Sequence, residues 1–134
     1  MVLSFKIKST AELIFDYLSD MQKFVLVHPV IFKIDDTGNN TYLVHEKLQF
    51  GFIPVTFTYP FTIEKNLANK IIIMRATVMK FTKIEIHFSL KQENDFTLVE
   101  ETIQFKSPLP VKFIMQGIFK KQHTQLFKNI ETKN

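Results

Sequence analysis

The sequence contains no cysteine, which excludes a disulfide framework, a thiolate nucleophile and a cysteine metal ligand. A reducing, cytoplasmic setting is therefore the expected one. Glycine is nearly as scarce, with three in 134 residues. Loops that cradle phosphates or dinucleotides need several closely spaced glycines, so nucleotide-binding fingerprints of that kind are excluded. No Ser/His/Asp order typical of a hydrolase is present either.

Long hydrophobic runs are also missing. No apolar stretch approaches the roughly 20 residues that a membrane-spanning helix requires. The N-terminal segment from Val2 to Lys8 alternates between apolar and polar residues, whereas a signal peptide carries a continuous apolar block. We therefore expect no integral membrane association. Nothing in the composition indicates a linker, so residues 1–134 are expected to form a single domain.

Arginine occurs once, at Arg75, and the other sixteen basic residues are lysines spread along the chain. Bidentate recognition of phosphates and guanines favours the planar fork of arginine, while scattered lysines usually form a solvated surface. The formal charge of +4 therefore does not indicate nucleic-acid binding. Four histidines are present without an HExxH motif or a His/Cys cluster, so we expect no metal site and no cofactor.

Hydrophobic residues make up 46% of the chain, including fifteen Phe and five Met, which is enough for an independent core. Apolar and polar residues alternate with a period of two over much of the sequence, a pattern typical of strands. The segment 71–79 is apolar on both faces, as in a strand covered on both sides. The predicted strands are 3–7, 31–35, 42–52, 55–64, 71–79, 83–91 and 97–106.

Helical signals lie between the first two strands and at the C-terminal end. Ser9 and Glu12 have the spacing of a capping box, which predicts that Ser9 caps a short helix. Asp20 can cap a second short helix, which should end at His28 because Pro29 disfavours helical geometry before it. From residue 111 to about 131 the period is helical. One broad apolar face of this helix holds Val111, Ile114, Met115, Ile118, Phe119, Leu126 and Ile130.

This order of elements predicts an α+β fold. A seven-stranded antiparallel sheet should curl around the long C-terminal helix, because a flat sheet of that width leaves its edges poorly covered. A curled sheet and one helix rarely touch along their whole length. The gap between them is where a cavity is expected.

The chain resembles the SRPBCC (START/Bet v 1-like) superfamily, most of all bacterial polyketide cyclase/dehydrase-like and ligand-binding members. The resemblance is carried by the helical segment 11–20, the strand entry 97–101, the step at Pro108 into the last helix, and the pairs Gln122-His123 and Leu126-Phe127 within it. It covers nearly the whole chain, as a pattern and an order of elements.

The resemblance implies a helix-grip fold with a hydrophobic pocket between the sheet and the C-terminal helix. Relatives use this pocket for lipids, sterols, polyketides or other apolar molecules, and some cyclise or dehydrate polyketides. The superfamily has no universal catalytic residue to carry over. Function therefore depends on the residues of the site itself.

Two charged residues interrupt apolar strand faces. Glu46 shares its face with Tyr42, Val44 and Leu48, and a carboxylate there must be paired or have a raised pKa. Glu46 has two interpretations. In the functional one it is an acid/base in the pocket or an anchor for a ligand hydroxyl. In the structural one it lies on an edge strand, at a bulge or in a salt bridge to Arg75. Arg75 itself either contacts a ligand or pairs with a carboxylate such as Glu46, Glu100 or Glu101.

Polar residues on the last helix give further candidates. Gln122 lies near the centre of its apolar face and must contact a ligand or donate to a sheet carbonyl. His123 sits at the edge of that face, either at a pocket mouth or as a partly exposed boundary residue. His45 and His87 are expected on the surface. The candidate pocket-lining residues are Glu46, Tyr59, Arg75, Met115, Ile118, Phe119, Gln122, His123 and Leu126.

Three functions remain open from the sequence. The first is binding of a small hydrophobic molecule of lipid, polyketide or aromatic type, favoured by the apolar helix face and the lack of a catalytic constellation. The second is a cyclase or dehydratase-type enzyme in which Glu46 or His123 moves protons. The third is an interaction module whose groove receives an apolar segment of a partner protein, which predicts a large exposed apolar patch.

Overall fold

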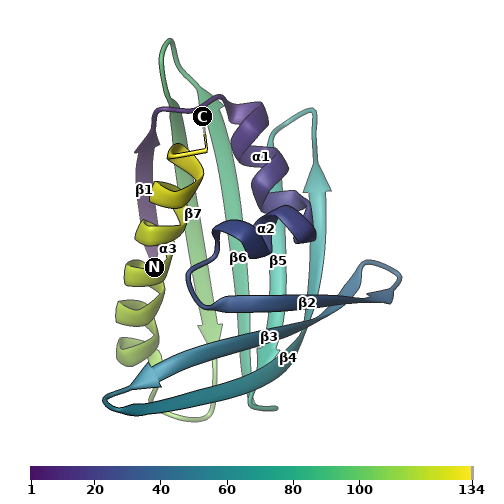
Figure 1. Ribbon diagram of the computed structural model, residues 1–134, viewed down its shortest axis with the longest axis vertical. Helices are drawn as coiled ribbons and strands as arrows, with labels where there is room; N and C mark the ends of the chain where they lie inside the picture. Colours follow the sequence, from purple (N-terminus) through teal and green to yellow (C-terminus); the bar gives the residue numbers. More distant parts are fainter. Residues whose placement is uncertain (134) are drawn as a thin grey trace.

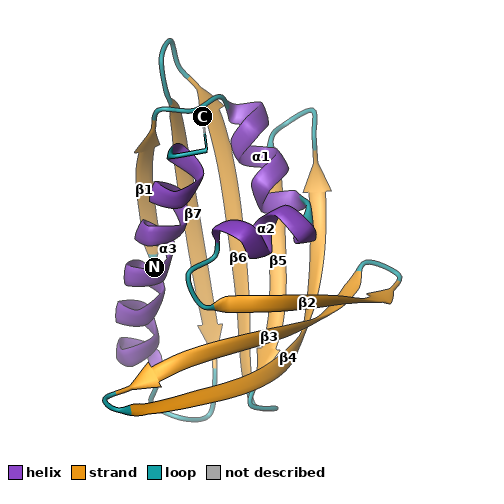
Figure 2. Cartoon of the chain, in the orientation of Figure 1, coloured by secondary structure: helices purple, strands orange, loops and turns teal. Residues whose placement is uncertain are grey.

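The computed structural model describes residues 1–133, apart from the side chain of Phe50. Within them, seven strands and three helices alternate in the predicted order (Figures 1 and 2). The α+β helix-grip architecture predicted from the sequence is confirmed. In chain order the elements are β1 (Val2–Ile7), α1 (Ala11–Ser19), α2 (Met21–Val27), β2 (Ile31–Gly38), β3 (Thr41–Phe50), β4 (Ile53–Asn66), β5 (Ile71–Val78), β6 (Thr82–Gln92), β7 (Thr97–Lys106) and α3 (Lys112–Glu131).

All seven strands form one antiparallel sheet in the order β1-β7-β6-β5-β4-β3-β2. The strand β4 is 14 residues long and bends, so that β2 and β3 cross in front of β5 and β6 (Figure 1). This bend gives the sheet its concave face. The helices α1 and α2 lie over one end of that face and α3 lies along its side (Figure 2).

Strand register brings apolar side chains into continuous rows on the concave face. One row crosses four strands, because Ile63 pairs with Met74, Met74 with Ile86, and Ile86 with Ile103. All four side chains are buried. The alternation read from the sequence therefore identifies the core face correctly on β4, β6 and β7.

The first helix is capped differently from the prediction. Thr10, not Ser9, is the N-cap of α1, and its hydroxyl accepts a hydrogen bond from the Leu13 N–H. Ser9 is buried and its carbonyl accepts a hydrogen bond from Thr97 on β7. This contact with a distant strand fixes which of two adjacent hydroxyl residues starts the helix. The cap of α2 by Asp20 and its end before Pro29 are confirmed.

The long helix α3 has two unlike halves. Its buried residues, Gln122, His123, Leu126, Phe127 and Ile130, all lie in the C-terminal half. The first turns expose Phe113 and Ile114, and no side chain caps the helix at Val111. The apolar face predicted from Val111 to Ile130 is therefore buried in its second half, while Met115, Ile118 and Phe119 of its first half line a cavity. No described helix has the length and apolar character needed to cross a membrane.

Candidate ligand-binding site

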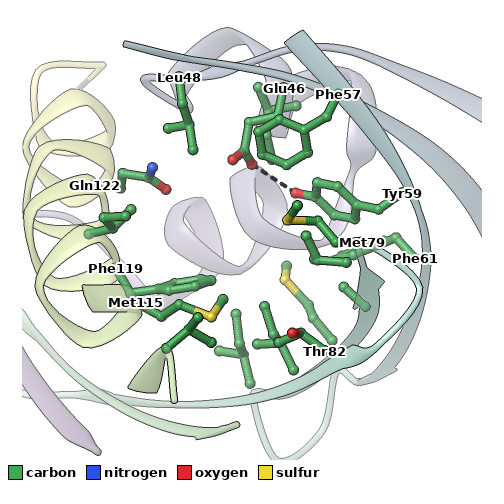
Figure 3. Close-up of a pocket in the computed structure, with 18 of the residues that line it drawn as sticks. Glu46, Leu48, Phe57, Tyr59, Phe61, Met79, Thr82, Met115, Phe119 and Gln122 are labelled. Atoms are coloured by element: carbon green, nitrogen blue, oxygen red, sulfur yellow. Dashed lines mark hydrogen bonds between the residues drawn. The ribbon is translucent and has the colours of Figure 1, made fainter. Parts of the chain in front are cut away.

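A cavity of about 360 Å³ lies between the concave face of the sheet and the first half of α3. Its size falls in the range of small-molecule sites in proteins. Side chains from β3 to β6 and from α3 form its wall, and most of them are aliphatic, aromatic or methionine (Figure 3). The first half of α3 borders the cavity, whereas the buried residues of α3 all lie in its second half.

Glu46 projects from β3 into this apolar space and is only 9% exposed. The Tyr59 hydroxyl donates a hydrogen bond of 2.9 Å to Glu46 Oε1. Burial raises the pKa of Glu46, although the Tyr59 hydrogen bond and the nearby His123 oppose the shift. Burial also raises the pKa of Tyr59 well above its usual value, with the Glu46 charge adding to it. The pair is therefore a carboxyl group whose pKa lies above its usual value, held by a phenol that stays neutral.

Gln122 projects into the same space from α3 (Figure 3). Its side chain is buried, and among the described residues its amide forms no hydrogen bond with a sheet carbonyl or any other protein group. Of the two roles left open by the sequence, donation to a sheet carbonyl is therefore wrong. The amide group is available to a molecule in the cavity.

His28, at the end of α2, also lines the cavity. Its Nδ1 accepts hydrogen bonds from the backbone N–H groups of Val30 and Ile31, at 3.2 and 3.1 Å. Burial, and secondarily the charge of His123, lowers the pKa of His28 well below its usual value. With Nδ1 accepting, the neutral ring carries its proton on Nε2. His28 was not among the sequence candidates.

His123 of α3 and Glu101 of β7 form a buried pair. The His123 Nδ1 and Glu101 Oε2 are hydrogen-bonded, and the two residues are 3% and 0% exposed. The other oxygen, Glu101 Oε1, is buried without a hydrogen-bond partner among the described residues. The interpretation of His123 as a partly exposed boundary residue is wrong, because Glu101 draws its ring inward. His123 also contacts the Phe119 ring, 5.2 Å away, at the cavity wall.

The structure brings seven of the nine candidate residues to the cavity wall and leaves two outside. Leu126 belongs to the core under the second half of α3 and does not line the cavity. Arg75 lies on the opposite face of the sheet. Those that line the cavity are Glu46, Tyr59, Met115, Ile118, Phe119, Gln122 and His123.

Arg75 alternates with the buried residues of β5 and therefore points outward. Its guanidinium pairs with Glu85 on β6, at 2.9 Å, and with Glu64 on β4, at 3.0 Å. The placement of Arg75 in the pocket, and its proposed pairing with Glu46, Glu100 or Glu101, are wrong. His87 bonds Glu85 on this same outer face, as expected of a surface histidine, while His45 is half-buried against Asp35.

Glu101, the buried partner of the cavity-lining His123, was missed, although the sequence carries its signal. Along β7 the inward positions are Thr97, Val99, Glu101 and Ile103, so the carboxylate stands in the middle of an apolar row. The same criterion that singles out Glu46 would have found it. Among the described residues, no three His, Asp or Glu side chains are grouped as metal ligands would be.

Comparison with known structures identifies this arrangement. A START superfamily protein from Mycobacterium smegmatis superposes with a TM-score of 0.76 over 99% of this chain and 94% of its own, at 19% identity. Ara h 8.0201 gives 0.70 over 99% and 97%, also at 19% identity. The chain has the helix-grip fold of the SRPBCC proteins.

Another helix-grip structure, the ZhuI aromatase/cyclase from Streptomyces sp. R1128, gives a TM-score of 0.69 at 9% identity, covering 99% of this chain and 91% of the other. Identities this low establish the fold and carry no residue roles. No family model matches the sequence, and no curated protein matches it significantly. The resemblance seen in the sequence is thus confirmed as a shared fold.

Proposed function

We propose that this protein binds a small hydrophobic molecule of lipid, polyketide or aromatic type that carries one polar group. The observation that supports this most is Glu46, a buried carboxyl group in an apolar cavity with a phenol as its only hydrogen-bond partner among the described residues. A purely structural carboxylate would have a cationic partner, because burial of an unpaired charge is costly.

The distribution of polar groups gives the bound molecule an orientation. Glu46, Tyr59 and Gln122 face the cavity (Figure 3), and His28 at the end of α2 also lines it. The polar group of the ligand would sit between Glu46 and Gln122. Its apolar body would extend along Met115 and Phe119, where the flexible thioether adapts to irregular shapes.

The raised pKa of Glu46 lets it recognise two kinds of oxygen. In its protonated form the carboxyl group donates a hydrogen bond to a ligand carbonyl, and in its ionised form it accepts one from a hydroxyl. The Gln122 amide offers a donor and an acceptor to the same group. A ligand with a ketone, phenol or alcohol therefore fits better than a pure hydrocarbon.

A second function, a cyclase or dehydratase-type reaction in the same cavity, is favoured by that same pKa. A carboxyl group whose pKa is raised by burial in an apolar pocket suits general acid/base catalysis. Glu46 would exchange a proton with a carbonyl or hydroxyl of the substrate while the cavity holds it folded. His123 is the less suitable proton donor, because Glu101 already holds its Nδ1.

Native mass spectrometry of protein purified from its own cells tests the binding function. A retained apolar compound is expected, and it should be missing from an Ala76→Phe variant, whose ring would fill the cavity floor. Ala68→Phe, in the exposed turn after β4, is the matched control and should retain the compound. Retention by Ala76→Phe would contradict binding in this cavity.

The compound so identified then separates binding from catalysis. Added at about 100 times its dissociation constant, it should stabilise the protein by about 2.7 kcal/mol if it binds only the native state. Conversion of the compound by the native protein, lost in Glu46→Gln while affinity persists, would establish the enzyme. If the compound stabilises the protein but is not converted, the protein is a binder and not an enzyme for that compound.

A further inference from the structure

Large hydrophobic side chains are concentrated at the end of the molecule where the cavity opens. Among the described residues, nine large hydrophobic side chains are more than 60% exposed, and six of them belong to this end. They come from the β3–β4 hairpin, the β5–β6 hairpin and the first turn of α3, at the lower end of Figure 1. We call them the apolar tips: Phe52, Ile53, Met79, Phe81, Phe113 and Ile114.

The charges at this end are of one sign. The segments that form it, 47–58, 76–84 and 103–121, contain seven lysines and no Asp or Glu. The rest of the chain contains ten basic and thirteen acidic residues. All seven lysines are exposed, and none forms a salt bridge among the described residues. A molecule with a formal charge of only +4 therefore has one strongly positive end, around the apolar tips.

The β5–β6 turn holds two residues in an unfavourable backbone conformation. Met79 and Lys80 both have positive φ, 54° and 66°, a conformation that favours Gly, Asn or Asp. The β2–β3 turn, with Asn39 and Asn40 at φ of 55° and 60°, uses the residue type that such a turn prefers. A methionine in such a strained position indicates a role outside the turn itself.

We propose that this end of the molecule docks on an anionic lipid bilayer. The apolar tips would enter the boundary between headgroups and acyl chains, and the lysines around them would contact the phosphates. The cavity wall includes Met79, Phe81 and Ile114, so its mouth would face the hydrocarbon. An apolar molecule would then pass between cavity and bilayer without crossing water.

The shape of this surface favours a bilayer over a protein partner. A groove for an apolar peptide segment is a continuous depression, whereas the apolar tips stand on two separate hairpins and a helix start. Phe52, at 99% exposure, has no side-chain packing of its own. Protruding single side chains within a positive field match an interface that is fluid, apolar below its surface and negatively charged at it.

Vesicle sedimentation of the full chain tests the proposal. We expect binding to phosphatidylcholine vesicles that contain phosphatidylglycerol, and little binding to phosphatidylcholine alone or at high salt. Phe52→Ser/Phe113→Ser should weaken binding about tenfold or more through lost apolar burial. Lys80→Gln/Lys112→Gln should weaken it about fivefold for each lysine.

Matched controls come from the same chain. Leu26→Ser/Leu67→Ser removes two side chains of 70% and 63% exposure from other surfaces, and Lys65→Gln/Lys91→Gln removes two exposed lysines elsewhere. Both should bind vesicles as the native protein does. Equal loss in the controls, or no binding to anionic vesicles at low salt, would overturn the proposal. Self-association abolished by the Phe52/Phe113 change would overturn it in favour of a second copy.

This docking is measured without any cavity ligand, so it can fail while the proposed ligand binding stands. Neither Phe52 nor Phe113 lines the cavity. The Phe52→Ser/Phe113→Ser variant should therefore retain a co-purified compound while losing vesicle binding. Ala76→Phe should show the reverse behaviour, which distinguishes the two functions in the same preparation.

Discussion

Tyr59 and Glu46 are diagonal neighbours on adjacent strands, and the Tyr59 hydroxyl donates a hydrogen bond of 2.9 Å to Glu46 Oε1. Val44 pairs with Tyr59 and Glu46 with Phe57 in the β3–β4 ladder, which fixes this offset. The hydrogen bond leaves Glu46 Oε2 for another partner.

Glu46→Gln should change how stability depends on pH. Because the folded protein raises the pKa of Glu46 above its usual 4.5, the contribution of this group to stability is full below that value. It is lost as pH rises through the raised pKa. Glu46→Gln keeps an acceptor for Tyr59 but does not titrate. Its free energy of unfolding should therefore rise relative to that of the native protein as pH increases through the raised pKa, and the difference should stay constant above it. Urea unfolding from pH 4 to pH 8 measures this.

The same change at exposed Glu100 on β7 is the control for this series. It should show no such pH-dependent gain over the native protein. A constant difference between Glu46→Gln and the native protein across the range would show that Glu46 does not titrate abnormally. That result would also remove the physical basis for an acid/base role.

His28→Asn should remove a loss of stability at acidic pH. The folded state lowers the pKa of His28 below its usual 6.5, so below that pH only the unfolded chain takes up this proton. Native stability should therefore fall as pH drops from about 6.5, with a slope approaching about 1.4 kcal/mol per pH unit. Asn can accept the Val30 N–H without titrating, so its variant should lack this component.

The measurement is the free energy of unfolding between pH 5 and pH 7.5. As pH falls, His28 lowers the free energy of unfolding, whereas Glu46 raises it. Single variants are therefore needed to separate the two contributions. His87→Asn, on the exposed outer face, is the control. An unchanged slope in His28→Asn would contradict a neutral His28 in the folded protein.

The buried Glu101–His123 pair should show strong coupling. His123→Leu leaves a carboxylate buried without its partner, which should cost about 3–5 kcal/mol of stability. Changing both partners, in Glu101→Leu/His123→Leu, should be much less destabilising than the sum of the single changes. A double-mutant cycle by urea unfolding measures the coupling. The Glu85–His87 pair on the outer face is the matched cycle and should show much weaker coupling, because solvent screens it.

Two adjacent hydroxyl residues should respond differently to loss of the hydroxyl. Thr10→Ala removes the cap of α1 and should cost about 1 kcal/mol. Ser9→Ala removes a buried hydroxyl that has no hydrogen-bond partner among the described residues, so it should be neutral or stabilising. Thermal unfolding of the two variants compares them directly. A larger loss for Ser9→Ala would restore Ser9 as the effective cap.

Local patterns in the sequence were sufficient for the sheet and for the orientation of Glu46. Alternation along β3 and β4 places Glu46 and Tyr59 on the concave face, as predicted, because a half-buried strand shows its two faces in its composition. The cap by Asp20 and the stop at Pro29 are likewise local effects, decided within a few residues.

Arg75 and His123 could not be placed this way. The strand β5 is apolar on both faces, so its composition does not reveal which face is inward, and the partners Glu64 and Glu85 come from neighbouring strands. His123 is drawn inward by Glu101, 22 residues earlier in the chain. Side-chain pairs between distant segments depend on register and packing, which periodicity along one segment does not encode.

The uneven burial of α3 divides the helix into two parts of different local stability. From Gln122 onward, opening the helix would expose the buried core side chains of α3, whereas the turns before it contain none of its buried residues and line the cavity. Backbone amides in the first half should therefore exchange with solvent through small fluctuations, and those in the second half only when the whole domain unfolds. The first half of α3, at the entrance to the cavity, can open locally while the rest of the protein stays folded.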